Sequence, residues 1–264
     1  MVAARRAGFG LLLGGSLVVA LAFFAIPLIA LFTEVPLGDV PSLLGDPMVK
    51  DALKVTARTT LVANLLFLGI GTPAAYFLAT RRKFPGRSLV LTFVELPLVL
   101  PPAVAGIALL AAFGRGGLLG DELQSRGIIL PFTEWAVVLA VTFVAAPFYL
   151  RQAITAFESV DPVLTDAART LGASPARTFW RVALPLAASG LVAGWVLAFA
   201  RGIGEFGATI VFAGAVQGVT QTLTLTIYSE LDADFDVALA IGVLLVVLSA
   251  FVLLAYKVVS AWRS

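Results

Sequence analysis

The sequence contains neither cysteine nor histidine among its 264 residues. Their absence excludes disulfide bonds, thiol nucleophiles, imidazole acid–base catalysis and zinc sites built from the usual ligands. The Walker A signature is missing too, because neither Gly-Lys-Ser nor Gly-Lys-Thr occurs. We therefore expect a chain that is not an enzyme, holds no metal or cofactor and does not itself bind ATP.

Charge is scarce as well, at 13% of residues against about a quarter in a typical soluble domain. Hydrophobic residues make up 60% of the chain, and the mean hydropathy is +1.01. The apolar runs cover residues 8–32, 59–80, 88–113, 135–157, 184–212 and 237–256. Because a membrane-spanning helix needs about 20 apolar residues, the sequence predicts an all-α membrane protein with six transmembrane helices.

The first apolar run is longer than the roughly 7–15-residue core of a signal peptide, so we interpret it as a membrane helix. No linker, low-complexity tract or internal repeat marks a second domain. We expect residues 1–264 to form a single transmembrane domain.

Basic residues predict the orientation, because Lys and Arg are enriched in cytoplasmic loops. With the N-terminus inside, twelve of the eighteen lie on the inner side and five on the outer. The inner set is Arg5, Arg6, Arg81, Arg82, Lys83, Arg87, Arg151, Arg169, Arg177, Arg181, Lys257 and Arg263, and the outer set is Lys50, Lys54, Arg58, Arg115 and Arg126. Both termini and the loop at residues 158–182 are then cytoplasmic. Short basic loops indicate topology and not a nucleic-acid surface.

The loop at residues 158–182 carries helix start and stop signals in close succession. Asp161 can cap a helix that begins at Pro162, and Gly172 can end it in a left-handed conformation. Ser174 and Pro175 then repeat the start signal. The sequence predicts two short helices joined by a tight glycine turn.

On the first of these helices, one face is apolar and rich in small residues. The face consists of Leu164, Ala167, Ala168 and Leu171, which follow helical spacing. Small side chains let another surface approach closely. An amphipathic helix that lies on the membrane or packs on its own bundle explains the same spacing equally well.

The same loop resembles the EAA motif of ABC-importer permeases, in which Glu-Ala-Ala precedes a glycine and then Ile-x-Leu-Pro. The matching positions are Asp166, Ala167, Ala168, Gly172, Val182, Leu184 and Pro185. Asp166 replaces Glu and Val182 replaces Ile. The resemblance implies a type I permease fold and a coupling helix seated in a separate ATPase subunit. The contacts it implies come from Leu164, Asp166, Ala167, Ala168, Leu171, Gly172, Leu184 and Pro185.

Other stretches resemble the molybdate permeases within that family. They are Leu-Pro-Leu-Val-Leu-Pro-Pro at residues 96–102, Phe-Gly-Arg-Gly-Gly at 113–117 and Phe-Ala-Arg-Gly-Ile-Gly-Glu-Phe-Gly-Ala-Thr-Ile at 199–210. Sulfate and tungstate permeases share much of this pattern, so the oxyanion class is better defined than the oxyanion. Gly116 stands where many relatives place a second Arg.

Pro97, Pro101 and Pro102 interrupt the third apolar run, because proline lacks the backbone N–H that a helix needs. Irregular backbone at membrane depth must be covered by protein or face a water-filled cavity. The run therefore holds either a structural kink or a bend along the translocation route, near a gate.

Arg201 and Glu205 are four residues apart in the fifth apolar run and can pair on one helix face. They form either an internal ion pair or, on a second interpretation, a site where Arg201 faces a passing dianion. Glu95 is expected to be buried and to compete for Arg201. Glycines 202, 204 and 207 allow close helix packing.

The resemblance implies an importer in the prokaryotic inner membrane that moves molybdate or tungstate by alternating access. Its implied partners are a second copy of the chain, two ATP-binding cassette subunits that hold ATP and Mg, an extracytoplasmic oxyanion-binding protein and the lipid bilayer. Sulfate or thiosulfate is the alternative cargo. An ATP-independent secondary transporter and a non-transporting scaffold are alternatives of other classes.

Overall fold

The computed structural model describes residues 2–35, 38–81 and 83–261, and within them it contains helices and loops without strands. The long helices are α1 (Val2–Glu34), α3 (Pro47–Thr80), α7 (Glu134–Glu158), α10 (Leu184–Ile203) and α13 (Phe235–Ala261). The short ones are α2 (Val40–Leu43), α4 (Arg87–Val99), α5 (Pro102–Phe113), α6 (Gly120–Ser125), α8 (Pro162–Thr170), α9 (Pro175–Thr178), α11 (Gly207–Phe212) and α12 (Leu223–Glu230). In the described residues, five helices can cross a membrane, or six if the bent pair α4 and α5 is one span.

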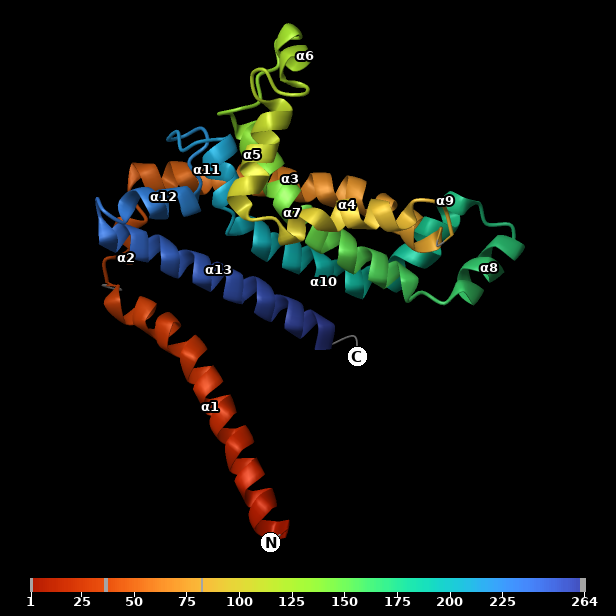
Figure 1. Ribbon diagram of the computed structural model, residues 1–264, viewed down its shortest axis with the longest axis horizontal. Coiled ribbons are helices and arrows are strands. Elements are labelled where there is room, and N and C mark those ends of the chain that lie inside the picture. The colour runs from red at the N-terminus through yellow and green to blue at the C-terminus, as the bar shows by residue number, and fades with distance from the viewer. Residues whose placement is uncertain (1, 36–37, 82, 262–264) are drawn as a thin grey trace.

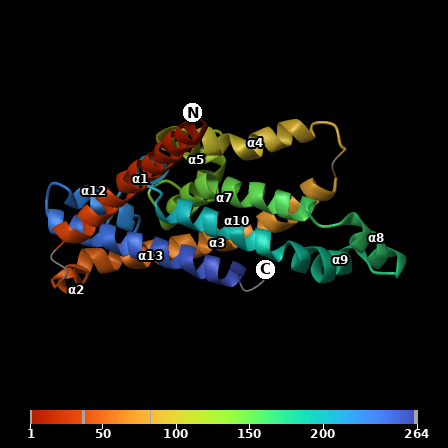
Figure 2. The ribbon, with the colours of Figure 1, turned by 90° about the horizontal axis from the view of Figure 1, so that it is seen from below.

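Helix α7 lies at the centre of the bundle and packs against α3 on one side and α10 on the other. Helix α13 runs beside them, and α8 and α9 extend beyond one end (Figures 1 and 2). Helix α1 leaves the bundle at an angle, and none of its apolar window is buried within the chain. Its hydrophobic surface is therefore available to lipid or to another subunit.

Glycines spaced by multiples of four residues let α10 approach α7 closely. A Cβ atom added at Gly190 would lie 2.5 Å from the Ala156 Cβ, and one at Gly194 would lie 2.8 Å from the Gln152 Cβ. Helices in lipid associate through such close packing, since the apolar side chains gain little by leaving lipid for one another. The α7–α10 pair thus depends on these small residues.

The third predicted span, residues 88–113, is interrupted, as its prolines indicated, and is not one continuous helix. The chain bends by 120° between α4 and α5, at Leu100 and Pro101. Leu100 has an extended ψ of 135°, because a residue before proline avoids the helical region. The two prolines that follow cannot donate to the α4 carbonyls, so the helix stops and restarts.

The fifth predicted span, residues 184–212, is also interrupted. Helix α10 ends at Ile203, Gly204 caps it, and α11 begins at Gly207. At its N-terminal end, α10 begins at residue 184 as predicted, but α9 and a π-helical turn at Phe179–Ala183 lead directly into it, so the continuous helical segment starts at Pro175. Glycine and a side-chain cap, described below, account for the interruption.

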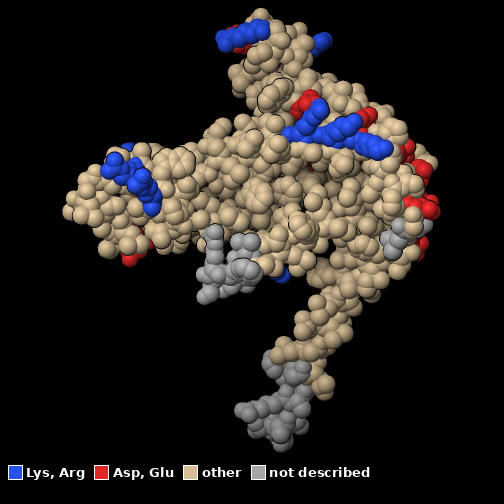
Figure 3. All heavy atoms as spheres, turned by 180° about the vertical axis from the view of Figure 1, so that it is seen from behind, with Lys and Arg blue, Asp and Glu red and all other residues tan. Residues whose placement is uncertain are grey.

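Charged side chains gather toward the two ends of the long axis and on the α6 projection, and the face between is nearly free of charge (Figure 3). This distribution is typical of a bundle whose middle lies in hydrocarbon. Arg82 and Arg263, which contribute to the predicted charge bias, lie outside the described residues, as do the side chains of Arg5 and Arg6.

We predict that Gly190→Leu lowers the thermal unfolding temperature of the detergent-solubilised protein. The added side chain must displace Ala156, and overpacking of this kind costs about 1–3 kcal/mol. Ser189→Leu is the matched control, because Ser189 is exposed. Equal unfolding temperatures for the two variants would contradict the role given to this contact.

Candidate functional site: an exposed helical loop and two interrupted helices

The loop between α7 and α10 begins with a capped helix. Asp161 Oδ1 accepts a hydrogen bond of 2.9 Å from the Val163 N–H, and Pro162 occupies the first turn. A side-chain acceptor satisfies an N–H that a helix start leaves unpaired, and proline there loses no bond. Helix α8 therefore begins where the sequence predicted.

Helix α8 ends in a glycine turn, also as predicted. Gly172 has a φ of +84°, a left-handed conformation that glycine adopts without a Cβ penalty. The Ala173 N–H donates to the Ala168 carbonyl at 3.0 Å, and the Gly172 N–H donates to the Arg169 carbonyl at 2.9 Å. These bonds satisfy carbonyls at the helix end.

The second short helix is the start of a continuous rod. Ser174 Oγ accepts a hydrogen bond of 3.3 Å from the Arg177 N–H, which begins α9. Helix α9 then passes through the π-helical turn into α10, and Leu184 and Pro185 lie at the start of α10. A displacement of the loop would consequently act on a transmembrane helix with no flexible linker between them.

The predicted small-residue face of α8 lies on the surface. Leu164 is 47% exposed and Leu171 is 88% exposed. Ala167 is exposed and Ala168 is partly buried, and Asp166 lies on the surface as well. Within the described chain three of the four residues of this face are exposed, so most of it is accessible to a partner.

An aromatic cluster, which the sequence reasoning missed, anchors the loop to the bundle. Tyr76 from α3 and Phe157 from α7 have ring centroids 5.3 Å apart. Phe179 packs on both, at 4.8 Å from Tyr76 and 6.2 Å from Phe157, and Trp180 lies 4.9 Å from Phe179. The sequence signal that could have revealed this cluster is the adjacent pair Phe179 and Trp180, two large aromatic residues within the predicted loop.

The interruptions in the third and fifth apolar runs meet in space. A Cβ atom at Gly207, the first residue of α11, would lie 2.6 Å from the Pro102 Cβ at the start of α5. One at Gly106 would lie 2.8 Å from the Ala208 carbonyl oxygen. Helices α5 and α11 therefore pack as a tight pair. Pro101 and Pro102 are exposed, and Pro97 is partly buried inside α4.

Arg201 and Glu205 form the ion pair that the sequence allowed. Arg201 Nη1 lies 2.7 Å from Glu205 Oε2, and the Glu205 side chain is 1% exposed against 28% for Arg201. Glu205 Oε1 accepts a hydrogen bond of 2.7 Å from the Ala208 N–H and so caps α11. The Thr224 hydroxyl donates to the Glu205 carbonyl oxygen at 2.7 Å. One residue thus connects α10, α11 and α12.

Glu95 does not compete for Arg201, contrary to expectation. Its side chain is 44% exposed, and its Oε1 lies 3.9 Å from Nε of Arg151 on α7. Because the chain bends by 120° between α4 and α5, α4 points away from α5, which is the helix that packs on α11. A Cβ atom added at Gly202 would lie 3.1 Å from Val141 Cγ1, whereas one at Gly204 would lie 3.9 Å from the Ala200 carbonyl oxygen, an ordinary contact distance.

Comparison with known proteins shows which family the chain belongs to. The family described as "Binding-protein-dependent transport system inner membrane component" matches residues 71–264. The chain belongs to this family. It is therefore a multi-pass inner-membrane permease of an ABC importer and not an ATPase.

Among relatives of this permease, the molybdenum transport system permease protein ModB of Mycobacterium tuberculosis is 44% identical over 90% of this chain and 89% of its own length. The sulfate transport system permease protein CysT of Escherichia coli is 34% identical over 97% of this chain and 94% of its own.

The fold of the permease is also that of solved ABC importers. A chain of a bacterial alginate ABC transporter, solved with an alginate pentasaccharide-bound periplasmic protein, superposes with a TM-score of 0.77 over 96% of this chain and 93% of its own. Its sequence identity of 18% supports the fold alone.

We predict that Glu205→Gln destabilises the permease by up to about 3 kcal/mol, since it leaves Arg201 without its counter-charge. Glutamine can still accept the bond from Ala208, so the α11 cap is kept and only the charge is tested. Thermal unfolding is the measurement. The double variant Arg201→Gln with Glu205→Gln should regain part of the loss, and a double variant that loses the sum of both single changes would contradict the pairing.

Proposed function

We propose that the permease imports a tetrahedral oxyanion, namely molybdate or tungstate. Transport occurs by alternating access and is driven by a separate ATPase. The exposed small-residue face of α8 supports the proposed coupling to the ATPase. This face lies on a short loop that leads directly into α10. This surface suits a partner that pushes on the loop. The aromatic cluster around Phe179 would transmit the push to α3 and α7 as well.

The proposed topology has both termini and the α8 loop in the cytoplasm, and residues 1–264 form one permease domain. The distribution of Lys and Arg supports this orientation. It puts α8 on the side where ATP is present, which an ATP-driven importer requires.

The proposed assembly is two copies of the chain, two ATP-binding cassette subunits that bind ATP and Mg, and an extracytoplasmic oxyanion-binding protein. A twofold ATPase dimer needs two equivalent coupling loops, and two copies of one chain supply them. The uncovered apolar surface of α1 is consistent with a second subunit beside it.

In the coupling site, we assign the ATPase contact to Leu164, Ala167, Ala168 and Leu171 on α8. Gly172 sets the turn, and Leu184 and Pro185 begin the helix that moves. Asp166 lies beside Arg169, 3.9 Å from its Nη1, and can offer a carboxylate at the edge of the interface.

Along the pathway, we propose that the bend at Pro101 and Pro102 and the paired half-helices α5 and α11 form the gate. Pro97 and Glu95 lie on α4, before the bend. Arg201 is largely neutralised by Glu205, so we assign this pair to holding the α10–α11 junction and not to attracting the anion. A neutral pathway suits an importer whose binding protein selects the cargo.

Molybdate is proposed on the similarity to ModB over nine-tenths of both chains. Sulfate is the alternative, because CysT matches almost the whole chain at lower identity. Tungstate shares the size and charge of molybdate and is expected to follow it.

The coupling assignment predicts that Ala168→Arg abolishes both ATPase association and uptake, because a long cation replaces a methyl group on the docking face. Ala176→Arg is the matched control, since Ala176 is exposed on α9 beyond the glycine turn. Co-purification of the ATPase and uptake into proteoliposomes measure the two effects. Uptake by the Ala168→Arg variant at the control level would disprove the assignment.

The cargo assignment predicts that labelled molybdate enters proteoliposomes holding the complete transporter only when ATP is inside. Excess tungstate should compete, and sulfate should compete much less. Strong competition by sulfate would make this chain a sulfate permease, and uptake that follows an ion gradient without ATP would contradict the ABC mechanism.

A further inference from the structure

A polar cavity of about 810 Å³ lies behind α8, between that helix and the end of α3. Its rim holds three cationic side chains, Arg81 and Lys83 from the α3–α4 loop and Arg169 from α8. Thr80 and Thr165 also line it. Two separate segments of the chain therefore present hydrogen-bond donors to one space.

The cavity has an excess of positive charge. Asp166 is the carboxylate in its described lining, and it lies 3.9 Å from Arg169 Nη1. Among the described residues, no carboxylate forms an ion pair with Arg81 or Lys83. The Arg81 guanidinium lies 5.2 Å from the centroid of the Phe77 ring, a cation–π contact that restricts the position of this side chain. An anion is the ligand that these groups would attract.

The cavity faces away from the proposed ATPase contact. At 100° per residue, Pro162, Thr165, Asp166 and Arg169 share one side of α8, and all four line the cavity. The face formed by Leu164, Ala167, Ala168 and Leu171 is on the opposite side. An ATPase seated on that face leaves the cavity side of α8 uncovered.

The position of the cavity favours a lipid over a free ion. The apolar run at residues 59–80 of α3 is long enough to cross the hydrocarbon and ends at Thr80, so the cationic rim directly follows it in the chain. The lining also includes the apolar and aromatic groups Tyr76, Phe84 and Phe157, which suit the glycerol and upper acyl part of an amphiphile. A free oxyanion would gain nothing from these groups. Basic pockets at this depth, on the cytoplasmic side of membrane proteins, suit phosphate headgroups.

We propose that this cavity binds the phosphate headgroup of an anionic phospholipid from the leaflet on the α8 side. The phosphate bridges Arg169 on α8 to Arg81 and Lys83 on the α3–α4 loop. The lipid therefore ties the coupling loop to α3, and movement of α8 opens or tightens the site. The inference rests on the proposed function only in that the ATPase covers the other face of α8.

Native mass spectrometry of the delipidated permease–ATPase complex tests this proposal. The complex is titrated with dioleoylphosphatidylglycerol, dioleoylphosphatidylcholine or inorganic phosphate, and retained ligands are counted. We expect selective retention of phosphatidylglycerol. Arg81→Gln with Arg169→Gln should weaken retention roughly 25-fold, which is about fivefold for each charge. Lys83→Gln alone should weaken it about fivefold and serves if the double variant does not assemble.

Arg177→Gln is the control, because Arg177 is an exposed cation of the same loop outside the cavity lining, and it should retain phosphatidylglycerol normally. Equal retention by all variants, or equal retention of phosphatidylcholine, would overturn the proposal. Retention of inorganic phosphate in place of lipid would make the cavity a free-oxyanion site. Lipid bound by the isolated permease but absent from the complex would mean that the ATPase fills the cavity. The same spectra report the subunit composition, so a failure of ATPase assembly is distinguishable from a loss of lipid.

Discussion

Glu205 places a carboxylate in the interior of a helix bundle that belongs in a membrane, where an unpaired charge is expensive. Its two oxygens have separate partners, the Arg201 guanidinium and the Ala208 N–H, and its backbone carbonyl accepts from Thr224. These contacts neutralise the buried carboxylate where α10 stops and cap the start of α11. The close approach of α11 to α5 depends on this junction.

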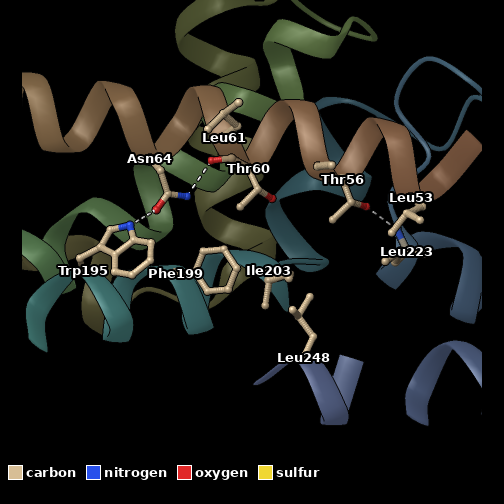
Figure 4. A pocket seen from close by; sticks show the side chains of 11 residues that line it. Leu53, Thr56, Thr60, Leu61, Asn64, Trp195, Phe199, Ile203, Leu223 and Leu248 are labelled. Carbon is tan, nitrogen blue, oxygen red and sulfur yellow. Dashed lines mark hydrogen bonds between the residues drawn. The ribbon is translucent and has the colours of Figure 1, made fainter. Parts of the chain in front are cut away.

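The coupling loop and this junction lie at opposite ends of one helix. Helix α8 turns at Gly172 into α9, which continues through the π-helical turn into α10, and α10 ends beside Glu205. The glycine contacts with α7 hold that helix along its length. Between α3 and α10 lies an apolar cavity of about 310 Å³, where Asn64 accepts a hydrogen bond from Trp195 Nε1 at 2.7 Å (Figure 4).

Local signals in the sequence predicted the two helix starts and the glycine turn in the loop at residues 158–182, because caps and a left-handed glycine depend on neighbours in the chain. The Arg201–Glu205 pair was predictable for the same reason. The bend of 120°, the meeting of Pro102 with Gly207 and the pairing of Glu95 with Arg151 were not, since each depends on how distant helices pack. The prolines predicted that the helix is interrupted after α4, but they did not predict the angle of the bend. The aromatic anchor of the loop, around Phe179, was missed because its partners come from α3 and α7.

The central claim is that one face of α8 enters the ATPase while the other faces the membrane domain. The chain has no native cysteine, so a single introduced thiol reports its own position. Cross-linking of Leu171→Cys and of Thr165→Cys to the ATPase in the assembled transporter is the direct test. The account predicts a cross-link from position 171 and none from position 165. The reverse pattern, or cross-links of equal yield, would contradict it.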